Sequence, residues 1–254
     1  MPVSTYIKQK IHEFFHLFGY QLVKRTEETI SMLSYPHRAT MYSALKRSKE
    51  RNIEINTVVD VGASYGVWSD ECMKIYPEAF YFLIEAQEPH RKGLEQFKQK
   101  HPKNTDFVIA AAGHERGEIY FDNSDLMGGI ASKTKLSDQY ITVPVTTIDH
   151  EVAHRKLKPP FLIKLDTHGF EVPILTGASQ TFSQTNLLVI ESYNFKLNDD
   201  CLRFWELCQH MEGLGFLPID LANILYRKKD LSFWQTDIFF VRKERPEFLY
   251  KQYT

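Results

Sequence analysis

Short apolar runs alternate with helix-like stretches from residue 57 onward, and this alternation constrains the fold more than any other feature. The runs are four or five residues long and lie at Thr57–Val61, Phe80–Ile84, Phe107–Ala111, Phe161–Leu165 and Leu187–Ile190. The helix-like stretches between them cover residues 67–76, 89–100, 171–182 and 199–213. Runs this short and this apolar are typical of parallel strands that helices cover on both faces. The pattern predicts an α/β fold with a mostly parallel sheet.

Two regions depart from this alternation. Residues 114–149 hold no obvious crossover helix, but contain a Gly128-Gly129 turn and the alternating segment Ile141–Val145, so we expect an inserted β-hairpin or loop excursion. Residues 216–242 resemble a strand, a hairpin and a final strand, Thr236–Val241. An antiparallel last strand on an otherwise parallel sheet fits this order.

The N-terminal segment has a different periodicity. Apolar residues recur at helical spacing over residues 4–25, and a second helix is expected from Tyr35 to Arg51. We therefore divide the chain into an N-terminal helical extension, residues 1–50, and a second domain, residues 51–254. The first helix packs on that domain or, with several basic residues nearby, serves as a peripheral membrane or self-association element. The sequence favours packing.

Composition excludes some classes of partner. The 31 basic and 32 acidic residues give a net charge of −1, and no basic tail or Arg-rich run is present, so we expect no nucleic-acid partner. No apolar run reaches the ~18 residues that a membrane span needs. Charged residues interrupt any signal-peptide core, and the three cysteines lack metal-ligand spacing. These features predict a cytoplasmic protein.

The segment Val58–Gly66 is the most informative motif. A strand ends, glycines permit a tight turn, and a helix begins near Val67, which lets a ligand approach the backbone at the carboxyl edge of the sheet. The spacing is D-x-G-x-x-x-G rather than the G-x-G-x-x-G of dinucleotide-binding proteins. Asp60 would repel a pyrophosphate but suits the positively charged aminoacyl end of S-adenosylmethionine. A nicotinamide oxidoreductase is therefore disfavoured.

A second acid completes this pattern. Glu85 closes the second apolar run, 25 residues after Asp60. A carboxylate in that position can accept both hydroxyls of a ribose and disfavours a 2′-phosphate. The predicted cofactor-binding residues are Asp60, Gly62, Ala63, Gly66, Glu85 and Ala86.

The chain resembles a known family at three places. Val58–Gly66 with Glu85 is similar to the first two motifs of class I methyltransferases. Ile163–Ala178 resembles the FkbM-type signature I-K-I-D-x-E-G-x-E-x-x-x-L-x-G-A, and Thr146–Asp149 resembles the T-x-D element before it. The resemblance covers about residues 55–242. It implies a Rossmann-like class I methyltransferase fold with a seven-stranded sheet, S-adenosyl-L-methionine as cofactor, and O-methylation, commonly of glycans or polyketides.

Asp166 and His168 are the candidate catalytic residues. Methyl transfer to a hydroxyl needs alignment of the acceptor oxygen and, in many cases, removal of its proton. An imidazole suits the role of base near neutral pH, with Asp166 orienting it or the acceptor. Alternatively Asp166 caps a helix or pairs with Lys164, and His168 is an ordinary loop histidine. The family signature has Glu where this chain has His168, which puts the identity of the base in question.

Neighbouring residues have open roles. Asp166, Glu191 and Asn194 can supply oxygen ligands to a divalent cation, but their spacing is not a metal motif, and we assign no metal. The loop Asp122–Lys135 is either a lid over the cofactor or a passive turn. Asp149 is a candidate cap for a helix that starts at His150. Glu171 suits a first helical turn through the dipole alone.

The sequence as a whole predicts an O-methyltransferase that acts on a hydroxyl, of a saccharide in polysaccharide or glycolipid biosynthesis. Its expected partner is a small-molecule or glycan acceptor. Two alternatives stay open. One is a non-catalytic binding module with the cofactor fold, which the substitution at His168 keeps open. The other is methylation of a non-sugar natural product.

Overall fold

The computed structural model describes residues 38–135, 140–198 and 201–253. The chain divides into two compact units, residues 1–38 and 39–254, and the second is described below. The helix expected over residues 4–25 lies outside the described residues. Nothing among the described residues forms a helix that is long and apolar enough to cross a membrane.

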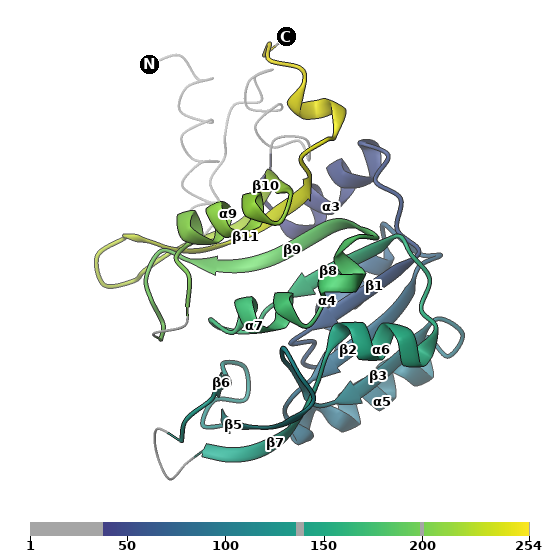
Figure 1. Cartoon of the computed structure of the whole chain (residues 1–254), viewed down its shortest axis with the longest axis vertical. Coiled ribbons are helices and arrows are strands. Elements are labelled where there is room, and N and C mark those ends of the chain that lie inside the picture. Colours follow the sequence, from purple (N-terminus) through teal and green to yellow (C-terminus); the bar gives the residue numbers. More distant parts are fainter. Residues whose placement is uncertain (1–37, 136–139, 199–200, 254) are drawn as a thin grey trace, which may run out of the picture. The chain divides into compact units, whose positions relative to one another are not determined.

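A seven-stranded sheet with helices on both faces forms the centre of this unit (Figure 1). Its strand order is β10-β11-β9-β8-β1-β2-β3. The strands are β1 (Thr57–Val61), β2 (Phe80–Glu85), β3 (Thr105–Ile109), β8 (Phe161–Leu165), β9 (Thr185–Tyr193), β10 (Phe216–Tyr226) and β11 (Phe233–Arg242). The last strand, β11, runs antiparallel to both neighbours, and the β9-to-β3 pairs are all parallel. The predicted sheet is confirmed, including its antiparallel last strand.

Alternate residues of the central strands supply two separate cores. Val59 and Val61 of β1 belong to one buried cluster and Val58 to the other, as the two-residue period of a strand requires. The helices are α3 (Met41–Glu50), α4 (Val67–Met73), η2 (Glu88–His90), α5 (Arg91–Lys100), α6 (Ile148–Arg155), α7 (Glu171–Thr176), α8 (Ser179–Phe182), α9 (Phe204–Gly213) and η3 (Pro246–Phe248). Helices on both faces explain why these strands are apolar throughout.

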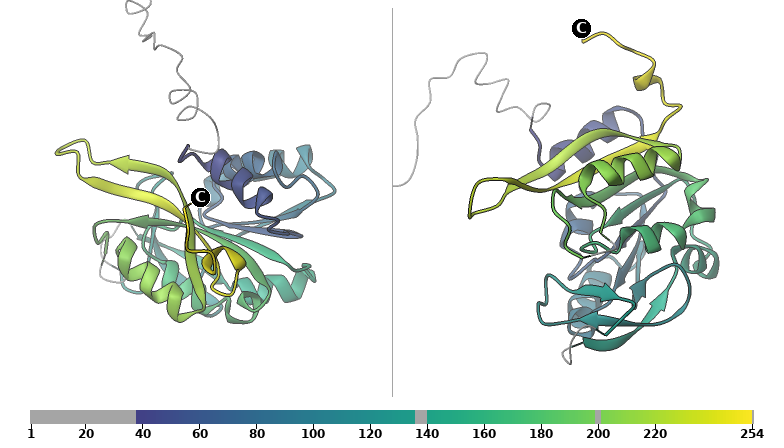
Figure 2. Two further views of the ribbon diagram at one scale, coloured as in Figure 1. Left: turned by 90° about the horizontal axis from the view of Figure 1, so that it is seen from above. Right: turned by 60° about the vertical axis from the view of Figure 1, so that its left-hand side comes forward.

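A second sheet occupies the region that lacked a crossover helix. Its order is β4-β7-β5-β6, from β4 (Ala111–Ala112), β5 (Gly117–Asp122), β6 (Ile130–Ser132) and β7 (Tyr140–Thr146). The inserted hairpin is confirmed as the antiparallel pair β5–β6, and β7 pairs antiparallel with the other edge of β5. The single strand expected over Phe107–Ala111 is wrong, because β3 ends at Ile109 and Ala111 joins the second sheet. Figures 1 and 2 show this sheet and the β10–β11 hairpin at opposite ends of the large sheet.

Two expected helices differ from the sequence prediction. The stretch 171–182 is broken into α7 and α8 at Gly177, where a side chain would lie 2.0 Å from the backbone oxygen of Gly113. The stretch 199–213 forms a helix only from Phe204. The break at Gly177 depends on its close approach to Gly113, which is distant in the sequence. Hydrophobic periodicity within a segment carries no information about such a contact.

Asp149 caps a helix, but not the one predicted. The N-cap of α6 is Thr147, whose hydroxyl oxygen accepts the backbone N–H of His150 at 3.0 Å. The Asp149 carboxylate instead accepts the backbone N–H groups of Gln180 and Thr181 at 2.9 and 2.8 Å. It therefore holds the beginning of α8, on a neighbouring element, by the same chemistry as an N-cap.

Helix α3 is held against the edge strand β10 by charge. The Asp220 carboxylate accepts two hydrogen bonds from Arg47, both 2.7 Å, and one from Arg51 at 3.0 Å. We predicted this helix from Tyr35 to Arg51. Within the described residues it begins at Met41 and ends at Glu50. The proposed boundary between residues 50 and 51 stays a prediction.

Candidate active site

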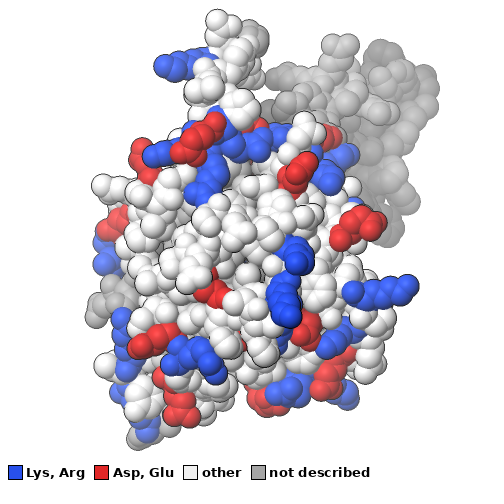
Figure 3. All heavy atoms as spheres, turned by 45° about the vertical axis from the view of Figure 1, so that its right-hand side comes forward, with Lys and Arg blue, Asp and Glu red and all other residues white. Residues whose placement is uncertain are grey.

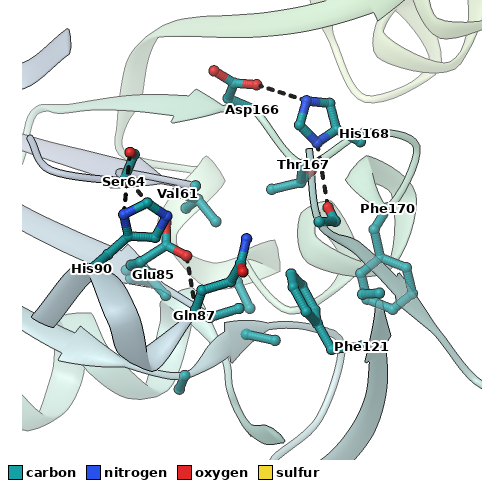
Figure 4. Close-up of a pocket in the computed structure, with 18 of the residues that line it drawn as sticks. Val61, Ser64, Glu85, Gln87, His90, Phe121, Asp166, Thr167, His168 and Phe170 are labelled. Carbon is teal, nitrogen blue, oxygen red and sulfur yellow. Dashed lines mark hydrogen bonds and ion pairs between the residues drawn. The ribbon is translucent and has the colours of Figure 1, made fainter. Parts of the chain in front are cut away.

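A pocket opens at the carboxyl ends of β1, β2 and β8 (Figure 4). Gly62 has a left-handed backbone with φ of 74°, and a side chain there would lie 2.0 Å from the backbone oxygen of Asp166. The backbone N–H of Asp166 in turn donates to Val61 at 3.1 Å. Only glycine fits this crossing, which brings the ends of β1 and β8 together beneath the pocket.

The pocket is walled by small, aromatic and acidic residues. Its empty space, including the part open to solvent, measures about 660 Å³. No lysine or arginine is among the described residues that line it. The lining residues are Val61, Gly62, Ser64, Ile84, Glu85, Ala86, Gln87, His90, Ala110, Ala111, Ala112, Phe121, Leu126, Met127, Gly129, Ala131, Asp166, Thr167, His168, Phe170 and Ile174. This composition suits a phosphate-free, cationic cofactor better than a dinucleotide.

Glu85 forms one end of the pocket. Its Oε2 accepts the backbone N–H of Ser64 and its Oε1 that of Gln87, both at 2.8 Å. The side chain is almost fully buried. Two backbone donors from different turns therefore fix the carboxylate before any ligand arrives, and each oxygen keeps a lone pair that can accept a ribose hydroxyl.

The predicted cofactor-binding residues divide into two groups. Gly62, Glu85 and Ala86 line the pocket, whereas Asp60, Ala63 and Gly66 do not. Asp60 is completely buried; its Oδ2 accepts the hydroxyl of Ser69 at 2.7 Å. It thus lies beneath the pocket, against α4, and its role toward a cofactor stays a prediction.

Ala63 and Gly66 shape the turn instead. Ala63 is buried among the core residues under α4. Gly66 begins α4 with φ of 81°, and a side chain there would approach the Phe97 ring to 2.9 Å. Both residues support the pocket through packing.

The loop between β5 and β6 covers part of the pocket. Its residues Leu126, Met127 and Gly129 line the wall, as the lid interpretation of Asp122–Lys135 predicts. The Leu126 carbonyl accepts the side-chain N–H of Gln87 at 2.9 Å and lies 2.9 Å from His90 Nε2. The sequence analysis missed Gln87 and His90, although their position just after Glu85 was an available signal.

Three side chains meet at the other end of the pocket. His168 Nε2 lies 3.7 Å from Asp166 Oδ1 and 3.6 Å from Glu191 Oε2. His168 Nδ1 lies 3.3 Å from the Gly129 carbonyl, which can only accept, so we assign a hydrogen to Nδ1. His168 has a left-handed backbone with φ of 51°, a conformation that is uncommon outside glycine. Its Nε2 faces two acidic side chains.

A buried ammonium supports this end from below. Lys164 Nζ lies 3.0 Å from Asp166 Oδ2 and 3.5 Å from Asp60 Oδ1. Burial alone would lower the pKa of Lys164, but the Asp166 and Asp60 carboxylates raise it above its ordinary value. Burial raises the pKa of Asp166, but Lys164 together with Glu191 and His168 holds it below its ordinary value. Burial, and then the Asp166 charge, raise the pKa of Glu191 to about 9.

Glu171 keeps the loop before α7 in place. Its Oε1 accepts the backbone N–H of Gly169 at 2.9 Å and the hydroxyl of Thr167 at 3.1 Å. The residue is buried. Its role is thus more specific than a dipole interaction, since it ties down the turn that carries His168.

The residues that could hold a metal differ from those the sequence suggested. Asp166, His168 and Glu191 each offer one ligand atom, and these atoms all lie within 4.8 Å of one another. Asn194, the third ligand considered from sequence, donates its backbone N–H to the Trp234 carbonyl at 2.9 Å.

Four features together define a protein of the class I methyltransferase type. They are the strand order of the large sheet, the glycine turn after β1, the acid at the end of β2, and a pocket whose described lining residues include no lysine or arginine to bind a phosphate. The family model of the methyltransferase FkbM domain matches residues 60–218, more than half of the chain. The chain belongs to the FkbM methyltransferase family, and S-adenosylmethionine is its cofactor.

One solved structure of an FkbM methyltransferase supports the fold. The FkbM methyltransferase from Methylobacillus flagellatus KT aligns at a TM-score of 0.50 with 15% identity, over 72% of this chain and 43% of that one. The chain thus spans less than half the length of that protein. The precorrin-6y C5,15-methyltransferase from Geobacter metallireducens GS-15 aligns at 0.43 with 12% identity, over 78% and 86% of the two chains. No curated protein matches the sequence.

Proposed function

We propose that this protein transfers a methyl group from S-adenosylmethionine to a hydroxyl of a saccharide, in polysaccharide or glycolipid biosynthesis in the cytoplasm. The observation that carries the proposal is the position of Asp166 and His168. Both line the cofactor pocket at the end opposite Glu85, and His168 Nε2 lies 3.7 Å from Asp166 Oδ1. A hydroxyl group placed there finds acceptors for its hydrogen.

The reaction divides the work between the two ends of the pocket. S-adenosylmethionine, when bound, supplies a methyl group that is already activated by a sulfonium. Glu85 holds the ribose, and Phe121 and Ile84 form an apolar wall that keeps water away. Asp166 and His168 hold the acceptor hydroxyl in line and favour loss of its proton. The acceptor oxygen then forms a bond to the methyl carbon as the carbon–sulfur bond breaks.

Aromatic side chains beside this end support a sugar as the acceptor. The Tyr193 ring lies 6.3 Å from His168, and Trp234 packs against Tyr193 and Phe195 at 6.0 and 5.5 Å between ring centres. Trp234 and Phe195 are partly exposed. Such faces can pack on the C–H face of a sugar ring while Asp166 and His168 contact its hydroxyls.

Surface charge favours a small acceptor over a nucleic acid. On the face shown in Figure 3, acidic and basic side chains are interspersed. A nucleic-acid-binding surface is expected to gather lysine and arginine into a stripe or patch.

Two measurements test the proposal. S-adenosylhomocysteine at a hundredfold excess over its Kd should stabilise the fold by about 2.7 kcal/mol, and NAD should not. Labelled S-adenosylmethionine should then transfer its methyl group to saccharides in an acceptor screen, and Asp166→Asn should prevent this. Stabilisation by NAD and not by S-adenosylhomocysteine would refute the assignment of Glu85 and its neighbours to an S-adenosylmethionine site. Cofactor binding with transfer only to non-sugar hydroxyls would overturn the saccharide, and no transfer to any acceptor would favour a non-catalytic binding module.

A further inference from the structure

The cluster of Asp166, His168 and Glu191 has more acceptors than the reaction above requires. Three lone-pair-bearing atoms, Asp166 Oδ1, His168 Nε2 and Glu191 Oε2, converge within 4.8 Å. Carboxylate oxygens and an imidazole nitrogen are the ligand types that divalent first-row metals accept. Their convergence from three positions of the chain is the arrangement of a coordination site.

Each of the three side chains has its other polar atom already engaged. Lys164 donates to Asp166 Oδ2 at 3.0 Å, the Gly129 carbonyl accepts from His168 Nδ1, and Gln235 donates to Glu191 Oε1. Outer partners of this kind orient metal ligands and fix the tautomer of a coordinating histidine. The remaining atoms, Asp166 Oδ1, His168 Nε2 and Glu191 Oε2, face one another, and Glu191 Oε2 also accepts the hydroxyl of Tyr193.

Acidic side chains at the cluster outnumber the ammonium that pairs with them. Lys164 is one ammonium shared by two carboxylates, Asp60 and Asp166. Glu191 adds a third acidic side chain, and within the described part of the chain its only ion-pair partner is His168. A divalent cation bound there would displace the protons that the ligands hold in its absence.

We propose that Asp166, His168 and Glu191 bind one divalent cation of the kind that accepts mixed nitrogen and oxygen ligands, with Mn²⁺ as the representative. Adjacent ligands of an octahedral ion with bonds of about 2.1 Å lie about 3.0 Å apart. The observed separations of 3.6 and 3.7 Å need only small side-chain rotations to reach this value. Oxygen-only Ca²⁺ suits the nitrogen ligand less well.

The inference deepens the proposed function and rests on it for its purpose. Three protein ligands leave open positions on the ion, which two neighbouring hydroxyls of a sugar can fill. A bound cation would make the hydroxyl more acidic, so that its proton could pass to water and the oxygen could attack the methyl carbon as the carbon–sulfur bond breaks. His168 is then a metal ligand, and the role of base that the sequence suggested for it is unnecessary.

The test measures metal binding directly, without acceptor. Full-length protein saturated with S-adenosylhomocysteine is titrated with Mn²⁺, and free Mn²⁺ is followed by electron paramagnetic resonance. One ion should bind per chain, and Glu191→Gln and His168→Ala should each weaken binding tenfold or more. The exposed acid variant Glu212→Gln serves as the matched control and should bind as the wild type does. Unchanged S-adenosylhomocysteine binding in all variants shows that they fold.

The outcomes separate the two proposals. Absence of Mn²⁺ binding, or equal binding in Glu191→Gln and the wild type, overturns the metal site. Methyl transfer that persists in full after chelation by EDTA also overturns it while leaving the methyltransferase proposal intact. Conversely, Mn²⁺ binding at these residues with no transfer to any hydroxyl supports the site and refutes the proposed function.

Discussion

The two ends of the pocket are built on opposite principles. At Glu85, each carboxylate oxygen accepts a backbone N–H, from Ser64 and Gln87, so the acid is satisfied and fixed. At the other end, three titratable side chains, Asp166, His168 and Glu191, bring their polar atoms within 4.8 Å of one another. An arrangement satisfied in advance is suited to holding a ligand in one position. Titratable groups this close change protonation together, which suits a reacting group whose charge changes, so binding and chemistry are assigned to different ends.

Asp166→Ala should give the largest effect and test this division directly. We expect kcat to fall by ~10²–10⁴, the range for loss of a group that promotes proton removal, with S-adenosylhomocysteine affinity little changed. His168→Ala should behave in the same way. Steady-state kinetics and calorimetric titration measure the two quantities. An equal loss of S-adenosylhomocysteine affinity would show that the ends are not separate.

Lys164→Met should be the most damaging change for stability. The ammonium is buried between Asp60 and Asp166, so its removal leaves two carboxylates without their counter-charge. Breaking a buried pair in this way costs about 3–5 kcal/mol. Urea unfolding measures the loss, and the exposed residue change Lys103→Met is the control. A loss no larger than in the control would mean that the acidic end does not depend on Lys164.

Sequence patterns predict some features of these two ends of the pocket and miss others. The sheet was predictable because strands that helices cover on both faces are apolar throughout. Glu85 was predictable because it directly follows such an apolar run, Phe80–Ile84. Asp60 also follows the rule in sequence, yet it shares the face of Val58, toward α4, and is buried there. Side chains alternate between the two faces of a strand. An error of one residue in the predicted end of a strand therefore assigns its last side chain to the wrong face.

The end of the pocket at Asp166, His168 and Glu191, here called the acidic end, was only partly predictable for a related reason. Asp166 and His168 lie two residues apart in a recognisable signature, and Glu191 ends the next strand, so each was singled out. The position of the His168 ring, however, also involves the Gly129 carbonyl, which comes from the loop between β5 and β6 of the inserted sheet. The break between β3 and β4 and the break between α7 and α8 were missed because both depend on contacts between segments far apart in the sequence.

Glu85→Ala should give the converse of the Asp166 result. Two ribose hydroxyls lose a charged acceptor, and each such hydrogen bond contributes roughly 1.5–3 kcal/mol. S-adenosylhomocysteine affinity should therefore fall by at least about tenfold, while kcat at saturating cofactor changes little. Glu88→Gln, on an exposed side chain, is the control. If kcat fell and affinity did not, the roles of the two ends would be exchanged.

Asp220→Asn should give the smallest effect, since Asp220 lies on the edge strand β10 and does not line the pocket. Burial would raise the pKa of Asp220, but hydrogen bonds from Arg47 and Arg51 hold it below its ordinary value. A carboxyl whose folded-state pKa is depressed stabilises the fold above its unfolded-state pKa, and this stability is lost as pH falls through the folded-state value. The variant should thus be less stable by about 1–2 kcal/mol at pH 7. The difference should shrink below the ordinary range of aspartate, near pH 4 and lower.

Urea unfolding of both proteins from pH 7 to pH 3 measures this difference, with Asp230→Asn as the control for an exposed pair with Arg227. That control should change stability little, because water and salt screen an exposed ion pair. Cofactor affinity and kcat of Asp220→Asn should match the wild type at temperatures where both are folded. A stability difference that is independent of pH would show that packing of α3, and not the charge of Asp220, holds this edge of the sheet. A change in kcat would show that the edge strand influences the acidic end of the pocket through β11 and β9, which separate it from β8.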